Sequence, residues 1–194
     1  MHIAKKGLRV LGIAESFSSR NNSILAGVVM RKDLRVDGFS FTATTVGGMD
    51  ATDSVIDLYE SFGREDINLI MIGGAVISWY NIIDPLRVLH ETGRGTIIVT
   101  YENSEGLEDD IIRHFPGDEL RLSAYRSLGR RFPVKLQTGH ILYIRSHGLG
   151  ENEAGRICSD FTYDGRVPDP IRVARLYARS ILHSPVSSGM DVRR

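Results

Sequence analysis

The order of strand-like and helix-like segments constrains the fold of this 194-residue chain more than any other feature. Three apolar or β-branched runs come first, over residues 9–14, 23–30 and 36–46, and only short polar stretches separate them. Short connections favour antiparallel pairing, so we expect a three-stranded meander. Strand-like and helix-like segments then alternate, which favours parallel strands joined by crossovers.

The rest of the chain can be divided by helix caps, breakers and apolar spacing. A first helix is predicted to begin at Asp50 or Thr52 and to end near Gly63. The remaining predicted elements are a strand over 67–72, a helix over 81–92, a strand over 96–101, two helical segments in 105–129, a bent strand or hairpin in 134–145, and helices over 152–161 and 169–183.

These elements predict one α/β domain over residues 1–183. Its expected fold is a ribonuclease-H-like mixed five-stranded sheet, an antiparallel meander followed by a βαβαβ unit, with additional C-terminal helices. In that order the first strand lies beside the fourth, and open α/β sheets bind ligands at the carboxyl ends of their strands. Glu15 should therefore lie close to Gly73. Residues 184–194 are expected to form a flexible polar tail.

Composition excludes several classes of protein. Lys+Arg and Asp+Glu both number 24, so any basic surface must be local. The single cysteine, Cys158, excludes an internal disulfide and a cysteine-cluster zinc site. No apolar run reaches the roughly 18 residues that cross a membrane, and the polar start has no signal-peptide core. We therefore expect a cytoplasmic protein without a membrane partner.

A stripe of arginines on the last predicted helix is a candidate phosphate-binding surface. Arg172, Arg175 and Arg179 follow each other at helical spacing, so their guanidinium groups fall on one face. Such a stripe can bind a nucleic-acid backbone. A solvated helix face would explain the same pattern.

Two short segments near the strand ends are further candidates. Trp79 and Tyr80 could stack on a base, as aromatic side chains of single-strand binders do, or they could pack under the following helix. The backbone of Gly47 and Gly48 could approach a phosphate closely, or it could form only a turn.

Four stretches carry a resemblance to a known family: residues 12–15, 46–52, 70–84 and 168–175. In this order they are similar to an uncharacterised, mainly archaeal family related to endonuclease V. The resemblance covers nearly the whole chain. It implies a ribonuclease-H-like fold and an ancestral metal-dependent endonuclease.

The chain departs from that family at the positions where the resemblance implies metal ligands. Members usually have Gly-Ile-Asp-Asp at the first strand end and Leu-Asp-Gly at the second, whereas this chain has Ala14 and Gly73 at the metal-binding carboxylates. Only Glu15 remains acidic there. Cleavage with Mg²⁺ or Mn²⁺ needs several oxygen ligands. We therefore expect a degenerate site without a metal or other cofactor, which retains binding to DNA or RNA.

Two alternatives remain open. An active nuclease could have rebuilt its site with Glu15 and Asp50 as catalytic carboxylates, together with Asp53 or Asp84, and would then need Mg²⁺ or Mn²⁺. Asp50 and Asp53 would otherwise only cap the first helix. The second alternative is a non-catalytic protein-interaction module. The sequence does not determine an oligomeric state.

Overall fold

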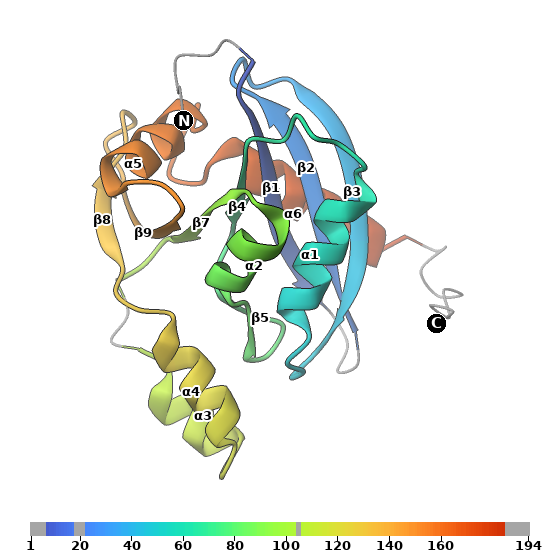
Figure 1. Ribbon diagram of the computed structural model, residues 1–194, viewed down its shortest axis with the longest axis vertical. Coiled ribbons are helices and arrows are strands. Elements are labelled where there is room, and N and C mark those ends of the chain that lie inside the picture. Colours follow the sequence, from blue (N-terminus) through green and yellow to red (C-terminus); the bar gives the residue numbers. More distant parts are fainter. Residues whose placement is uncertain (1–6, 18–21, 104–105, 185–194) are drawn as a thin grey trace.

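The computed structural model of the protein describes residues 7–17, 22–103 and 106–184 (Figure 1). Its main feature is a seven-stranded sheet of order β3-β2-β1-β4-β7-β9-β8. The first strand lies beside the fourth, as the sequence predicts. The strands are β1 (Arg9–Phe17), β2 (Asn22–Arg31), β3 (Val36–Thr45), β4 (Leu69–Ile72), β7 (Gly95–Thr100), β8 (Phe132–Lys135) and β9 (Ile141–His147).

One half of the sheet is a meander and the other begins with crossovers. β1 pairs antiparallel with β2, and β2 pairs antiparallel with β3. β4 pairs parallel with β1, and β7 pairs parallel with β4. The helices α1 (Ala51–Ser61) and α2 (Pro85–Thr92) carry the chain back between these parallel strands. The order confirms the meander followed by alternating strands and helices.

The sheet has two more strands than the five that the sequence predicts. β8 and β9 form an antiparallel hairpin, and β9 pairs antiparallel with β7. The hairpin turns through Gly139, whose φ of 87° is in the left-handed region. Leu142 and Ile144 of β9 are fully buried. The hairpin thus extends the sheet beyond β7 because its alternating apolar residues need a covered face.

Helices cover both faces of the sheet (Figure 1). On one face, α5 (Glu151–Asp160) and α6 (Asp169–Leu182) contribute Ile157, Ile171 and Ala174 to a core that includes Val10 and Met71 of the sheet. On the other face, α1 and α2 pack over a second core, which alternate residues of the same strands supply. Because side chains alternate along β1, Val10 lies in the first core and Leu11 lies in the second.

Smaller elements lie at the carboxyl ends of β1 and β4, at the lower end of Figure 1. They are a two-stranded sheet of β5 (Val76–Ile77) and β6 (Asn81–Ile82), and a helical hairpin of α3 (Glu108–His114) and α4 (Glu119–Ser127). The helix predicted from residue 81 begins only at Pro85. Asn81 belongs to β6 instead, and Asp84 caps α2 by accepting hydrogen bonds from the backbone N–H groups of Leu86 and Arg87.

Within the described ranges, no helix is long and apolar enough to cross a membrane. Residues 185–194 of the predicted tail lie outside the described part of the chain, and so do residues 18–21 in the turn after β1.

Candidate functional site

The carboxyl ends of β1 and β4 lie side by side, as the predicted strand order requires. Ile13 is paired with Ile72, and the Gly73 N–H donates to the Ile13 carbonyl oxygen at 3.0 Å. The two glycine-rich strand ends thus meet in one place. What this place can do depends on the side chains that face it.

The first turn of α6 packs directly over the two positions where the family resemblance implies carboxylates. Ala14 is only 3% exposed and belongs to the core that contains Ile171. At Gly73, an added Cβ would lie 2.8 Å from the Ile171 side chain. At Gly12, an added Cβ would lie 2.3 Å from the Pro170 backbone. An apolar helix end therefore occupies the space that acidic side chains would need.

Glu15 lies on the opposite face of the sheet from Ala14. β1 stays extended as far as Phe17, so consecutive side chains alternate between the faces. The Glu15 carboxylate accepts a hydrogen bond from the Ser23 hydroxyl at 2.9 Å. The one acidic residue of this strand end is thus bound to the neighbouring strand.

Asp50 connects the end of β3 to β6. Its carboxylate accepts hydrogen bonds from the Thr44 hydroxyl at 3.0 Å, from the Thr45 N–H and hydroxyl, and from the Asn81 amide at 2.6 Å. Burial opposes ionisation, but these hydrogen bonds together hold the pKa of Asp50 below its usual range. Asp50 occupies the N-cap position of α1 without a side-chain capping bond. The side-chain amide oxygen of Asn81 accepts from the Ala51 N–H instead.

The other two carboxylates considered for a rebuilt site, Asp53 and Asp84, also have partners within the protein. Asp53 forms an ion pair with Arg87 at 2.5 Å. Asp84 caps α2. Each of the four candidate carboxylates therefore already binds a side chain or a backbone N–H group of the protein.

The N–H groups of the Gly47–Gly48 turn are also occupied. The Gly47 N–H donates to the Ser78 carbonyl oxygen at 2.7 Å, and the Gly48 N–H donates to the Thr45 carbonyl oxygen at 3.1 Å. This geometry supports the turn interpretation, because neither N–H points to a ligand. The turn also lies against Trp79, whose ring is 3.4 Å from where a Cβ of Gly47 would be.

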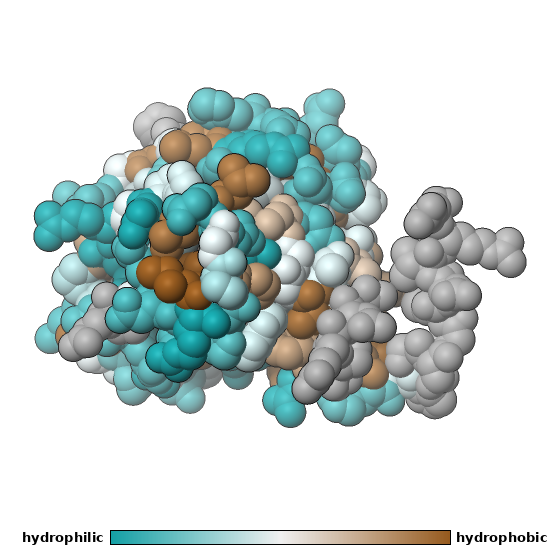
Figure 2. Space-filling model, turned by 90° about the horizontal axis from the view of Figure 1, so that it is seen from below, coloured by the Kyte–Doolittle hydropathy of each residue, from teal (hydrophilic) through white to brown (hydrophobic). Residues whose placement is uncertain are grey.

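Ser78, Trp79 and Tyr80 form a strained turn between β5 and β6. Their φ angles are 42°, 60° and 62°, so three consecutive non-glycine residues adopt the left-handed conformation. The Trp79 side chain is 48% exposed. Its ring lies 5.4 Å from that of Tyr80 and 5.0 Å from that of His114, between centroids. Figure 2 views this end of the molecule and shows apolar atoms exposed among hydrophilic ones.

Arg121 of α4 holds this turn against the Gly47–Gly48 turn. Arg121 is only 4% exposed, and its guanidinium donates to the carbonyl oxygens of Gly47, Gly48 and Tyr80. It also stacks over the Phe115 ring, 3.9 Å from the centroid. One buried cation therefore fixes the position of the exposed aromatic side chains.

The arginines of α6 have different surroundings. Arg172 forms an ion pair with Asp169, and Arg175 lies over the Tyr101 ring at 5.4 Å from the centroid. Arg179 is exposed. Within residues 7–17, 22–103 and 106–184, neither Arg175 nor Arg179 has a carboxylate at ion-pair distance. Burial raises the pKa of Tyr101, and the Arg175 charge opposes part of that rise.

The sequence is similar to a family model and to several archaeal proteins. The family model described as endonuclease dU matches residues 6–182. The chain belongs to the endonuclease dU family. A UPF0215 protein of Pyrobaculum calidifontis is 38% identical over 176 residues, which cover 88% of this chain and 95% of that protein.

Solved structures place this endonuclease dU family member in its fold. A protein of unknown function from Archaeoglobus fulgidus is 30% identical with a TM-score of 0.79, over 91% of this chain and 99% of that one. Ciona intestinalis endonuclease V, solved with an inosine-containing DNA, is 15% identical with a TM-score of 0.61, over 91% of this chain and 87% of that one. The endonuclease V likeness establishes the ribonuclease-H-like fold.

The β1 and β4 strand ends of this endonuclease dU family member offer few side-chain oxygen atoms to a metal ion. Among the described residues, no three His, Cys, Asp or Glu side chains are grouped so that they could hold a metal. Ala14 and Gly73 offer no side-chain oxygen, and Glu15 faces the other side of β1. Hard divalent cations need such oxygen ligands.

Several residues at this end of the protein could not be identified from sequence patterns. Arg121, His114 and Tyr101 come from segments far away in the chain, and none lies in a recognisable motif. The nearest local indication for Arg121 is Asp118 three residues before it, which caps α4 and pairs with it at 3.0 Å. Such spacing is common in surface helices and does not predict a buried contact.

Proposed function

We propose that this protein binds nucleic acid through the α6 arginines and the Trp79 turn, and does not cleave it with metal ions at the β1 and β4 strand ends. The observation that carries the proposal is the packing of Pro170 and Ile171 over Gly12, Ala14 and Gly73. This packing removes the space for a carboxylate centre. The same helix carries Arg175 and Arg179, whose charges no carboxylate neutralises in the described structure.

Three further observations support nucleic acid as the ligand. The fold is shared with endonuclease V, which has been solved in complex with DNA. Trp79 is exposed in a strained turn, and strain of this kind concentrates at ligand sites. The chain as a whole has no net charge, so the half-buried Arg175 and the exposed Arg179 on α6 give a local rather than a global attraction to phosphates.

The binding test compares two double variants that remove the same charge. The affinity for single-stranded, duplex and inosine-containing DNA and RNA would be measured by anisotropy of labelled oligonucleotides at several salt concentrations. R175Q/R179Q should weaken binding to all sequences and reduce the slope of log K against log salt by about 2, since each duplex phosphate contact contributes about 0.9. The control R35Q/R156Q changes two exposed arginines outside α6 and should leave the slope unchanged.

The result that would overturn the binding proposal is wild-type protein with no measurable affinity for any of these nucleic acids at low salt. A protein-interaction module would then explain the exposed surface better. Equal loss of affinity in the two double variants would also contradict the role of α6.

The cleavage part has its own test. Wild-type protein and E15Q should both leave inosine-, uracil- and mismatch-containing oligonucleotides intact in Mg²⁺ or Mn²⁺. Cleavage by the wild type that disappears in E15Q would show that Glu15 belongs to a rebuilt catalytic site, and would overturn this part of the proposal without affecting the binding result.

A further inference from the structure

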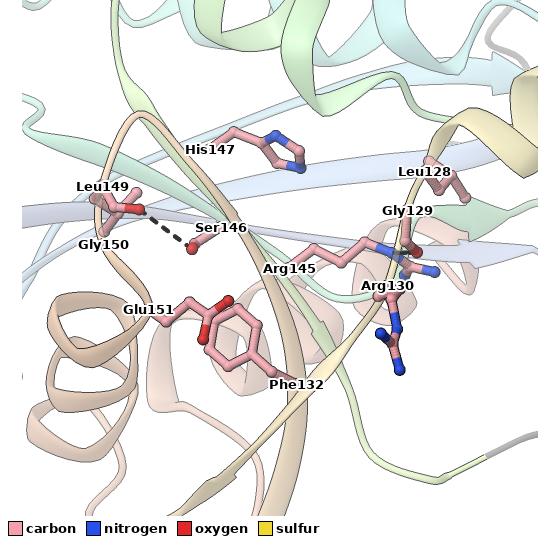
Figure 3. Close-up of a pocket in the computed structure, with 10 residues that line it drawn as sticks. All are labelled: Leu128, Gly129, Arg130, Phe132, Arg145, Ser146, His147, Leu149, Gly150 and Glu151. Atoms are coloured by element: carbon pink, nitrogen blue, oxygen red, sulfur yellow. Dashed lines mark hydrogen bonds between the residues drawn. The ribbon is translucent and has the colours of Figure 1, made fainter.

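A pocket of about 300 Å³ lies at the edge of the sheet, away from the α6 packing (Figure 3). It opens beside the start of β8, where β9 continues past it, since Phe132, the first residue of β8, pairs with Ile144 and β9 extends to His147. The segment between α4 and β8 forms one wall, and the segment between β9 and α5 forms another. The pocket is therefore built from three parts of the chain that no function has yet explained.

Arg145 of β9 is the central charge of this pocket. Its Nε donates to the Gly129 carbonyl oxygen at 3.0 Å, which directs the guanidinium across the pocket (Figure 3). Burial lowers the pKa of Arg145, and the nearby Arg131 charge adds to this effect. In the part of the chain that the structure describes, no carboxylate lies at ion-pair distance from Arg145. A half-buried cation without a counter-ion is costly unless something else supplies the negative charge.

The other polar groups of the pocket favour an anion. His147 follows Arg145 on the same side of β9, and its Nε2 is buried with no hydrogen-bond partner among the described residues. Arg130 is exposed at the wall, where it can add a second guanidinium. Glu151 is the one carboxylate among the described residues of the lining. It lies beside Phe132 in Figure 3 and is beyond ion-pair distance from Arg130 and Arg145.

A second, smaller pocket of about 120 Å³ shares Arg145 and Leu128 with the first. Gly74 and Thr100, at the carboxyl ends of β4 and β7, line it together with Arg131. Arg145 therefore stands between the sheet edge and the strand ends. Cationic side chains line both pockets, and among the described residues no acidic side chain lines the smaller one.

We infer that the pocket around Arg145 binds the phosphate group of a phosphate ester. A guanidinium presents a planar fork of N–H donors that matches the oxygens of a phosphate. A bound phosphate would supply the missing counter-ion of Arg145 and a partner for the His147 ring nitrogen. The inference does not rest on the α6 arginines, because no α6 residue lines either pocket. The phosphate can come from a free nucleotide or from a nucleic-acid strand.

Calorimetry with the full-length protein tests the pocket directly. The probes are inorganic phosphate, adenosine monophosphate and adenosine, at an ionic strength held constant with chloride. Phosphate and the monophosphate should bind saturably, whereas adenosine should not. R145Q should lose at least tenfold in affinity for phosphate, and R130Q should lose a smaller factor. The matched control R156Q should bind as the wild type does.

A further arm identifies the source of the phosphate. If a 5′-phosphorylated oligonucleotide binds more tightly than its 5′-hydroxyl form in the wild type but not in R130Q, the ligand is a nucleic-acid end. If the monophosphate binds and the two oligonucleotides do not differ, the ligand is a free nucleotide. R130Q changes an exposed residue, so it keeps the test valid if R145Q fails to fold.

Two results would overturn the inference. One is wild-type protein that shows no saturable phosphate binding at low ionic strength. The other is unchanged phosphate affinity in both R145Q and R130Q. Wild-type protein that binds the monophosphate but shows no measurable affinity for any nucleic acid would overturn only the proposed function, so the two proposals can fail separately.

Discussion

The guanidinium of Arg121 joins two turns that are far apart in the chain. It donates to carbonyl oxygens of both the Gly47–Gly48 turn and the Trp79–Tyr80 turn, and it is almost fully buried. Carbonyl oxygens that lose such a donor inside the protein become unsatisfied acceptors. The placement of the exposed Trp79 ring therefore depends on a residue of another element, α4.

Replacing Arg121 should destabilise the protein strongly. R121M keeps much of the side-chain volume but leaves the carbonyl oxygens and Asp118 without their donor, so we expect the free energy of unfolding to fall by about 3 kcal/mol. Urea denaturation followed by circular dichroism measures this. R126M changes a residue of the same helix as Arg121, removes only an exposed ion pair with Glu108 of α3, and should cost less than about 1 kcal/mol. Similar losses in the two variants would contradict the role of Arg121.

Asp50 should make stability depend on pH. Because its folded-state pKa is below its unfolded value, its contribution is present above the unfolded pKa and is lost as the pH falls through the folded pKa. The stability difference between wild type and D50N should thus be largest near neutral pH and shrink below a pH of about 4. Urea midpoints across this pH range measure it. D57N, which removes an exposed carboxylate from the same helix, is the control variant.

At the scale of elements, the position of α6 follows from the absence of side chains beneath it. Gly12 and Gly73 let the Pro170 and Ile171 turn approach the strand ends closely. Pro170 in the first turn begins the helix without losing a backbone hydrogen bond, since the first N–H groups of a helix have no internal partner. The close packing of α6 on the sheet thus depends on the small residues at these strand positions.

Adding one methyl group beneath α6 should therefore have a measurable cost. In G12A the new Cβ would overlap backbone atoms of Pro170, so the helix end must move, and we expect a loss of about 1–3 kcal/mol in the free energy of unfolding. Thermal and urea denaturation measure the loss. G7A is the matched control, because no atom of the described residues lies within 4 Å of its added methyl group. Equal stability of G12A and the wild type would mean that α6 is not held closely at this point.

At the scale of the whole molecule, local patterns predicted most elements and the central part of the sheet. The alternation in β1 and the capping signals of α2 and α6 are local, so the sequence displays them directly. The β8–β9 hairpin was open to two interpretations because a short apolar run with a glycine suits both a bent strand and a hairpin. Its place beside β7 is a long-range choice that no neighbouring residue encodes.

The site was less predictable than the fold, for the same physical reason. Arg121 contacts a carbonyl oxygen 73 positions away, and Asn81 binds Asp50 across 31 positions. Helical spacing after Asn81 suggested an early helix start, and the acidic Asp50 suggested a cap. Both side chains instead satisfy the polar groups where three segments converge. The family resemblance identified Ala14 and Gly73, but only the structure shows that α6 fills the space above them.

The exposed turn between β5 and β6 has one practical consequence. Trp79 is the only tryptophan of the chain. Intrinsic indole fluorescence of this protein therefore originates from a single place, the half-exposed tip beside His114 and Tyr80. The protein carries its own optical reporter at the proposed binding surface. A change in emission upon adding a ligand would be assignable to one residue without any label.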